Sequence, residues 1–330
     1  MLTVRENFLR SIKGQDPEYL TTFSLFWAMN GPPFFRPEPS ADGTIRNMFG
    51  VESVKDPGGV VDAYMPKTHD FILTDIAKWG DVIKLPNPDD ITDSAWADAA
   101  KQARDRHNFE IPFAGSTGIG GVFQTLVGVM GFTEGLTACY EEPELVKEMF
   151  AYITDYTVKM AKKFAYYYNP DYTALADDIA HERNPFVSLE MFKDIFAPCW
   201  KAYYDVFTEV GIPCGHHNCG YFEPLLEDLV SMGVTFWDPV QSSNDTFGIK
   251  EKYGKNLVMC QSYDVRFIND DTTEEEIRAT FRDYVSKIAP GGGWAFVRSG
   301  VETLVANREI ERQFVTWIYD EYDQIKNLYY

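Results

Sequence analysis

The sequence predicts an α/β fold, a (β/α)8 TIM-like barrel with an irregular N-terminal extension. Three observations predict it. Short runs of β-branched and aromatic residues recur along the chain, long amphipathic stretches alternate with them, and a length of 330 residues suits a closed parallel barrel. The sequence contains no tandem repeat and no glycine/serine linker. We therefore expect a single domain over 1–330, with an N-terminal decoration at 1–80 and the barrel body at 81–330.

Eight segments have the composition and length of strands. In chain order they are 21–27, 81–86, 111–115, 172–178, 212–219, 235–240, 257–264 and 293–300. Helical patterns lie at 143–168, 188–211, 223–233 and 272–293. In the last of these, Thr272 or Thr273 can cap the helix, acidic residues crowd its first turn, and glycine ends it. Residues 28–80 are rich in proline and glycine, which predicts irregular structure with a small hairpin or short helices.

Composition limits the functions that the chain can have. A formal net charge of −20 disfavours nucleic acid and anionic membrane surfaces as partners, because phosphate groups would be repelled. Five cysteines without the spacing of a disulfide framework indicate a reducing, intracellular setting. No apolar run approaches the ~20 residues of a membrane span, and the first residues lack the pattern of a signal peptide. We therefore expect a cytoplasmic protein.

The carboxyl ends of the predicted strands are polar, and in barrels of this kind the chemistry gathers there. The catalytic candidates are Asp177, Asp178, Tyr263 and Asp264, and the substrate-binding candidates are His216, Gln241, Asn30 and Arg298. Aspartate and serine at strand ends also cap helices and satisfy turn amides. We expect that structural role for Asp238, Ser299 and one of the two adjacent aspartates.

The stretch 214–220, CGHHNCG, places two imidazoles and two thiols within seven residues. In an extended chain His217 and Cys219 point to one side and His216 points to the other. Imidazole nitrogen and thiolate sulfur are ligands that zinc prefers, and a catalytic zinc site keeps one position open for substrate. The alternative is a buried cysteine, which behaves as a small apolar residue, beside a hydrogen-bonded histidine. The sequence thus predicts half of a zinc site at His217 and Cys219.

Several motifs resemble the uroporphyrinogen decarboxylase superfamily. The segments GHHNCGYFEPLLEDLVSMGVTFWDPVQ, IKEKYGKNLVMCQSYD and TTEEEIRATFRDYVSKIAPGGGWAF match its His-x-Cys-Gly, Lys-Glu-Lys-Tyr-Gly and Pro-Gly-Gly-Gly regions. Upstream, GSTGIGGVFQ and EEPELVKEMF are similar to its glycine-rich loop and the helix that follows. The resemblance covers roughly residues 70–325. It implies a (β/α)8 barrel with the active-site cleft at the carboxyl end of the strands.

Two chemistries compete within that superfamily. The decarboxylase acts on a porphyrinogen with many carboxylates, needs no metal and carries an arginine-rich signature, where this chain has only Arg36. The zinc-dependent methyltransferase branch exchanges methyl groups with a corrinoid (cobalamin) protein, and His217 and Cys219 match two of its zinc ligands. Its third ligand is a cysteine after the last strand, where this chain has Val301. The resemblance implies Zn²⁺ and a corrinoid partner protein, with a metal-free decarboxylase and a non-catalytic corrinoid- or metal-binding protein as alternatives.

The third metal ligand has three candidates. Cys260 ends the seventh predicted strand, two spacings of about 4.8 Å from the fifth, so side chains from both rims could close around one ion. Glu302 and Glu190 are candidate oxygen ligands, and Cys139, Cys199 and Cys214 are expected in the core. The expected reaction moves a methyl group between a small methyl ether or thiol and the corrinoid protein. The departure from the thiol-type ligand set favours the O-demethylase direction.

Overall fold

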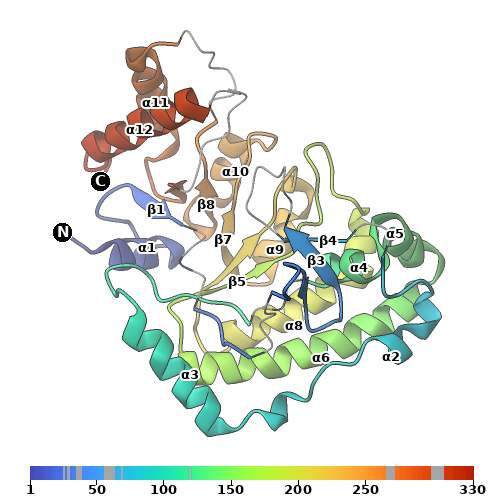
Figure 1. The fold of residues 1–330 in the computed structure, drawn as a ribbon. Helices are drawn as coiled ribbons and strands as arrows, with labels where there is room; N and C mark the ends of the chain where they lie inside the picture. Colours follow the sequence, from blue (N-terminus) through green and yellow to red (C-terminus); the bar gives the residue numbers. More distant parts are fainter. Residues whose placement is uncertain are drawn as a thin grey trace.

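The computed structural model describes residues 1–24, 27, 30–34, 39–55, 64–67, 70–117, 119, 121–264, 272–298 and 308–330. Its centre is a six-stranded parallel sheet in the order β1-β9-β8-β7-β6-β5 (Figure 1). The strands are β1 (Thr21–Phe23), β5 (Thr173–Ala176), β6 (Cys214–His217), β7 (Val234–Asp238), β8 (Val258–Gln261) and β9 (Trp294–Val297).

The two edges of this sheet approach each other through Ala114. On one side Ala114 forms a parallel bridge with Tyr172, next to β5. On the other side its carbonyl accepts hydrogen bonds from the backbone N–H (3.3 Å) and the side-chain amide (2.9 Å) of Asn30, which follows β1. The sheet therefore curves into a TIM-type barrel, and the predicted fold class is confirmed.

Helices surround the sheet (Figure 1). Their bounds are α1 (Val4–Ile12), α2 (Trp79–Val82), α3 (Asp93–Arg106), α4 (Val122–Met130), α5 (Phe132–Glu141), α6 (Pro143–Tyr168), α7 (Leu189–Met191), α8 (Ala197–Thr208), α9 (Leu226–Ser231), α10 (Thr246–Tyr253), α11 (Glu274–Ile288) and α12 (Arg308–Ile325). Short 3₁₀ turns lie at η2 (Ile76–Lys78), η3 (Pro88–Asp90), η5 (Glu223–Leu225) and η6 (Gly254–Asn256).

Two predicted helices are present, although the second, predicted over 272–293, ends at Ile288, before the glycines. Helix α6 has the predicted bounds, begins with proline in its first turn and ends at Asn169 in the left-handed conformation. Helix α11 is capped by Thr273, whose side chain and that of Glu276 form a reciprocal capping box. Among the described residues, no single helix is long and apolar enough to cross a membrane, although α4 and α5, bent by 112° at their junction, satisfy that test as a pair.

Three predicted elements differ in the structure. The predicted helix 188–211 is broken into shorter segments, and the predicted strand 81–86 does not form. Pro198 lacks a backbone N–H, and a five-residue π-helical segment, η4 (Phe192–Phe196), separates α7 from α8 just before it. Residues 79–82 instead form α2, and the amide of Leu85 donates to the Tyr152 hydroxyl of α6 (3.1 Å) where a strand partner was expected. Of the predicted strand 111–115, only Ala114 and Gly115 are bridge residues, and Ala114 pairs with Tyr172.

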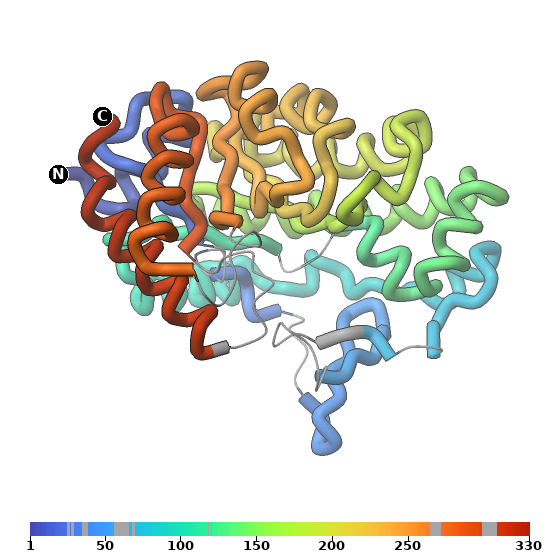
Figure 2. The backbone as a smooth tube through the Cα atoms, turned by 90° about the horizontal axis from the view of Figure 1, so that it is seen from above, coloured from blue at the N-terminus to red at the C-terminus, as the bar shows by residue number. Residues whose placement is uncertain are grey.

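A three-stranded antiparallel sheet occupies part of the irregular N-terminal region. It consists of β2 (Ile45–Arg46), β3 (Glu52–Lys55) and β4 (Tyr64–Pro66), in that order. Figure 2 shows this blue segment projecting from the barrel body. The expected small hairpin region is therefore present beside the barrel.

Aromatic side chains fill the barrel interior, and helix α1 closes its amino-terminal end. Phe8 and Ile12 of α1 belong to the same buried cluster as Phe23, Tyr172 and Phe236. Arg5 fastens α1 in place through paired hydrogen bonds to the carboxylate of Asp171, at 2.6 and 2.7 Å. Because Asp171 precedes β5, this plug lies at the amino ends of the strands. The carboxyl ends remain available for a site.

Gly215 makes a close contact that permits this packing. A Cβ atom built at Gly215 would lie 2.1 Å from the ring of Phe236, which is fully buried. We predict that Gly215→Ala lowers the free energy of unfolding by roughly 1–3 kcal/mol, the usual cost of overpacking a core. Urea denaturation measures this effect.

The double variant Gly215→Ala/Phe236→Leu should recover part of the loss, because leucine vacates the space that the ring occupies. Gly80→Ala is the matched control, since a Cβ there meets nothing within 4 Å. Equal stabilities of the Gly215 and Gly80 variants would contradict the prediction.

Candidate metal centre and active site

Asp177 anchors the amino end of α4 to the end of β5. Its Oδ1 accepts from the backbone N–H of Gln124 (2.8 Å), and its Oδ2 accepts from the N–H of Phe123 (3.1 Å) and from Trp200 Nε1 (2.8 Å). The side chain is fully buried, and burial raises the pKa of Asp177 to about 7 even though these hydrogen bonds lower it. Gly121 is required here, because a Cβ would lie 1.9 Å from the Asp177 carboxyl carbon. Asp177 therefore has a capping role.

Asp178, the next residue, faces a different environment. Its side chain is 33% exposed. Its Oδ1 accepts from the backbone N–H of Cys219 (2.7 Å), and its Oδ2 accepts from Gln124 Nε2 (2.9 Å). The same Oδ1 lies 4.0 Å from His217 Nε2. The carboxylate of Asp178 is thus attached directly to the His217–Cys219 segment.

His217 is oriented by Asp238, at the end of the neighbouring strand β7. His217 Nδ1 donates to Asp238 Oδ2 at 2.8 Å, and its Nε2 lies 4.0 Å from Cys219 Sγ. Burial alone would lower the pKa of His217, but the hydrogen bond to Asp238 and the nearby carboxylates raise it to about 11. A carboxylate on one imidazole nitrogen is the arrangement that usually orients a metal-binding histidine. Nε2 is then the nitrogen that faces Cys219 and Asp178.

The side chains of Asp178, His217 and Cys219 form a candidate metal centre, called the metal group below. One ligand atom each from Asp178, His217 and Cys219 lies within 4.8 Å of the others, and all three residues are partly buried. Nitrogen, sulfur and carboxylate oxygen are all accepted zinc ligands, and three protein ligands leave the fourth tetrahedral position open. The donor set therefore fits a catalytic zinc ion.

The other proposed metal ligands lie elsewhere or outside the described residues. Cys260 is fully buried in the apolar interior of the barrel, and burial raises its pKa well above the usual thiol value. It is not in the group formed by Asp178, His217 and Cys219. Glu190 is exposed in the first turn of α7. Val301 and Glu302, together with Ser299 and Arg36, lie outside the described residues.

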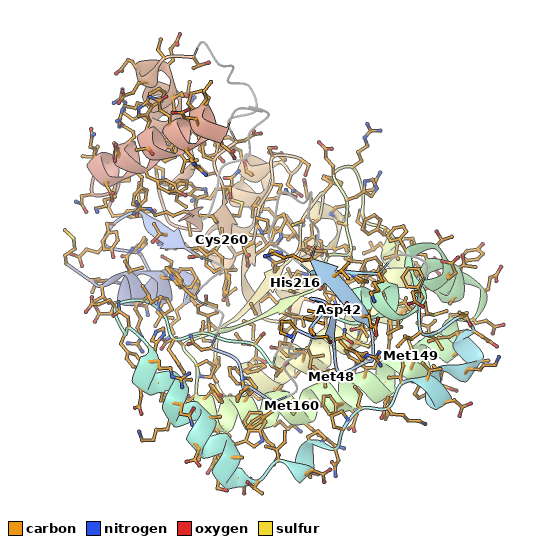
Figure 3. The ribbon with its side chains drawn as sticks, in the orientation of Figure 1. Asp42, Met48, Met149, Met160, His216 and Cys260 are labelled. Atoms are coloured by element: carbon orange, nitrogen blue, oxygen red, sulfur yellow. The ribbon has the colours of Figure 1, made fainter. Side chains whose placement is uncertain are left out.

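His216 points away from the metal group into the layer between the sheet and the helices. Its ring packs between Trp200 and Phe222, at centroid distances of 4.3 and 5.2 Å, and Tyr204 Oη lies 2.8 Å from its Nδ1. It is fully buried, and burial lowers its pKa well below the usual histidine value. Figure 3 shows His216 and Cys260 at separate positions of the central sheet. His216, a predicted substrate-binding residue, is therefore enclosed within this layer.

The four remaining candidates have packing or structural contacts. Asn30 uses its amide to hold Ala114, as described above. The Arg298 guanidinium lies over the rings of Tyr319 and Tyr322, at 5.0 and 5.4 Å, on α12. Tyr263 is buried against Phe281 and Tyr284, and burial raises its pKa to about 12. Asp264 follows β8 and is partly buried.

A cavity of about 330 Å³ adjoins the metal group through Cys219. Its lining residues come from the loops after β5, β6 and β7, and they are Ala180, His181, Glu182, Cys219, Gly220, Gln241, Ser242 and Ser243. Gln241 Oε1 accepts from the backbone N–H of Gly220 (2.5 Å), and the carbonyl of His181 accepts from Tyr221 N–H (2.8 Å). These bonds join the three loops into one wall. Gln241 is thus the substrate-binding candidate that lines a cavity at this rim.

Gln124, His181 and Glu182 are site residues that were not predicted from the sequence. The signal for the two cavity residues was their position just after a predicted strand that ends on Asp177 and Asp178. The signal for Gln124 was weaker. It depends on the glycine-rich loop before α4 placing the first turn of that helix against the end of β5.

Comparisons with known proteins agree with this architecture. The model of the family described as Uroporphyrinogen decarboxylase (URO-D) matches residues 62–300. No curated protein sequence matches the chain. Among solved structures, a methyltransferase from Methanosarcina mazei superposes with a TM-score of 0.66 at 15% identity, covering 98% of this chain and 99% of that protein.

A B12-independent methionine synthase from Shewanella sp. W3-18-1, in complex with selenomethionine, gives a TM-score of 0.46 at 12% identity, covering 86% of this chain and 76% of that protein. At such identities the structural likeness to the Methanosarcina protein concerns the fold. The family match covers well over half of the chain. The chain therefore belongs to the uroporphyrinogen decarboxylase (URO-D) family.

Proposed function

We propose that this protein is a zinc-dependent methyltransferase that moves a methyl group between a small methyl ether or thiol and a corrinoid protein. One observation carries the proposal: the ligand atoms of Asp178, His217 and Cys219 lie within 4.8 Å of one another at the carboxyl rim of the barrel. The structural likeness to a methyltransferase over nearly the whole chain is consistent with it.

The three residues would hold zinc, and the side chains around them prepare the site. Asp238 keeps the proton on His217 Nδ1, so a metal ion would displace the proton of Nε2 and bind its lone pair. The N–H of Cys219 donates to Asp178, so the backbone of one ligand orients the carboxylate of another. Zinc bound there would supply a Lewis acid that stabilises negative charge on the substrate heteroatom as its bond to the methyl group forms or breaks.

The ligand set favours an oxygen-bound substrate. Replacing a second thiolate by a carboxylate makes the site harder and better suited to oxygen than a site with two sulfurs. This supports the O-demethylase direction, in which a methyl ether loses its methyl group to the partner's corrinoid and leaves an alkoxide or phenolate. The cavity beside Cys219 provides room for the rest of that molecule.

The same cavity argues against the decarboxylase alternative. Its volume of about 330 Å³ is near the lower end of the usual range for ligand sites, ~300–1,000 Å³. Among the described residues, its lining includes Glu182 and contains no lysine or arginine. A porphyrinogen with many carboxylates needs a larger site with several cations.

The decisive experiment combines metal analysis with methyl transfer. Purified protein should contain one equivalent of zinc, and with an aromatic methyl ether and free cob(I)alamin as probes it should generate methylcobalamin, seen in the absorption spectrum. Metal-free protein that releases CO₂ from a porphyrinogen would establish the decarboxylase. Zinc-loaded protein that turns over neither a methyl ether nor a thiol with any form of cobalamin would favour a non-catalytic metal-binding role.

We predict that His217→Ala and Cys219→Ser each lose most of the bound zinc and the methyl transfer while the barrel stays folded, because rim side chains contribute little to its packing. Plasma emission spectrometry measures the metal and circular dichroism the fold. Cys199→Ser, at a half-buried thiol on α8, is the matched control and should retain full zinc. Full zinc content in both site variants would refute the proposed centre.

The identity of the third ligand gives a second prediction. Asp178→Asn should weaken zinc binding by at least the ~10–100-fold that changes around a metal site cause. Cys260→Ala should retain the metal and lose about 1 kcal/mol of stability, the cost of a small cavity in an apolar core. Competition with a chromophoric chelator measures the affinity.

If Cys260→Ala lost zinc affinity and Asp178→Asn retained it, Cys260 would be the third ligand. Unchanged binding in both variants would move the third ligand to an oxygen such as that of Glu302 or Glu190.

Asp177 and Asp178 should respond differently to substitution. Asp177→Ala removes the acceptor for three buried donors, so we expect it to lower the free energy of unfolding by roughly 1–3 kcal/mol. Asp178→Ala should change stability little and metal binding strongly. Thermal melts paired with zinc titrations separate the two effects. Equal, small losses of stability and of zinc affinity in both variants would contradict the capping role of Asp177 and the ligand role of Asp178.

A further inference from the structure

Both carboxylate oxygens of Asp178 are engaged, and by different donors. Oδ1 accepts the N–H of Cys219 at 2.7 Å and is the oxygen closest to His217, 4.0 Å from Nε2. Oδ2 accepts the side-chain amide of Gln124 at 2.9 Å. The carboxylate therefore presents Oδ1 to the metal group, while Oδ2 is bound by Gln124.

The main chain of Gln124 is firmly placed, and its side chain is exposed at the rim. It lies in the first turn of α4, and its own backbone N–H donates to Asp177 at 2.8 Å. Gln124 thus binds both aspartates, Asp177 through its main chain and Asp178 through its side chain. The close approach of α4 to β5 at Gly121 keeps this geometry fixed.

The denticity of Asp178 decides how many coordination positions the metal has left. A carboxylate can bind zinc through one oxygen or through both, and sites of this kind expand from four to five ligands when another oxygen joins. If Asp178 bound through both oxygens, the position intended for substrate would be partly filled. An amide that occupies Oδ2 opposes that change, because rotation of the carboxylate toward the metal would break the hydrogen bond.

We propose that Gln124 is a positioning residue: by holding Oδ2 of Asp178, it would leave Oδ1 as the oxygen offered to a bound metal ion and keep a coordination position open toward the cavity beside Cys219. This inference rests on the proposed function, since it concerns the same metal centre. Gln124 is neither a proposed zinc ligand nor a residue that lines the cavity, so this role is separate from both.

The test uses Co²⁺ in place of zinc, because its visible absorption is strong in four-coordinate sites and weaker in five-coordinate ones. Azide serves as the probe of the open position. The full-length wild-type protein should show the four-coordinate spectrum and bind azide. Gln124→Met removes the donor but keeps a good helix former of similar length. We expect it to show the five-coordinate spectrum and a ~10–100-fold lower azide affinity.

Two further variants make the result specific. Gln102→Met, at an exposed position of α3, is the matched control and should behave as wild type. Gln124→Lys restores a donor and should recover the wild-type spectrum and azide affinity. A Gln124→Met protein with the wild-type spectrum and azide affinity would overturn the proposal, and so would a folded Gln124→Lys protein that behaves like Gln124→Met. A wild-type protein that takes up neither zinc nor cobalt would instead overturn the proposed function.

Discussion

The buried carboxylate of Asp177 is the contact on which the arrangement of the site depends. It binds two backbone N–H groups of α4 and the indole of Trp200, and its own N–H donates to the carbonyl of His217. One residue thus joins β5, β6, α4 and α8. Because successive residues leave a strand on opposite sides, burying Asp177 sends Asp178 to the open rim. The position of the metal group therefore follows from the hydrogen bonds by which Asp177 caps the amino end of α4.

A second constraint acts on β6, where His216 and His217 are buried to different extents for the same geometric reason. His216 enters the aromatic layer of Trp200 and Phe222, whereas His217 turns toward Asp238 and the rim. Asp238 is almost fully buried, and its Oδ1 has no hydrogen-bond partner among the residues that the structure describes. There, the charge of this carboxylate is stabilised chiefly through His217. A cation shared between His217 and Asp178 would stabilise the same buried charge further. The polar groups of the rim thus form a network that a metal ion would complete.

Much of the fold could be predicted from the sequence, because its signals are local. The bounds of α6 and the capping box at Thr273 follow from residues within one or two helical turns. The prediction for segment 81–86 failed because α2 ends at Val82 and the amide of Leu85 donates to the Tyr152 hydroxyl of α6 instead of to a strand, a contact that only the tertiary structure reveals.

The site was predictable in part for the same reason. His217 and Cys219 are two residues apart, so period-two geometry places them together, but Asp178 comes from another strand and depends on Asp177 being buried. Cys260 was a reasonable candidate by strand order. In the structure its side chain takes the inward, interior-filling position on β8, and the donor that reaches His217 from a neighbouring strand is the carboxylate of Asp178. Ligand identity at a barrel rim depends on which face of each strand a side chain occupies as much as on the order of the strands. In the proposed centre, the carboxylate of Asp178 takes the place of the third cysteine that the family resemblance implies, and it brings a negative charge without any change in the strands.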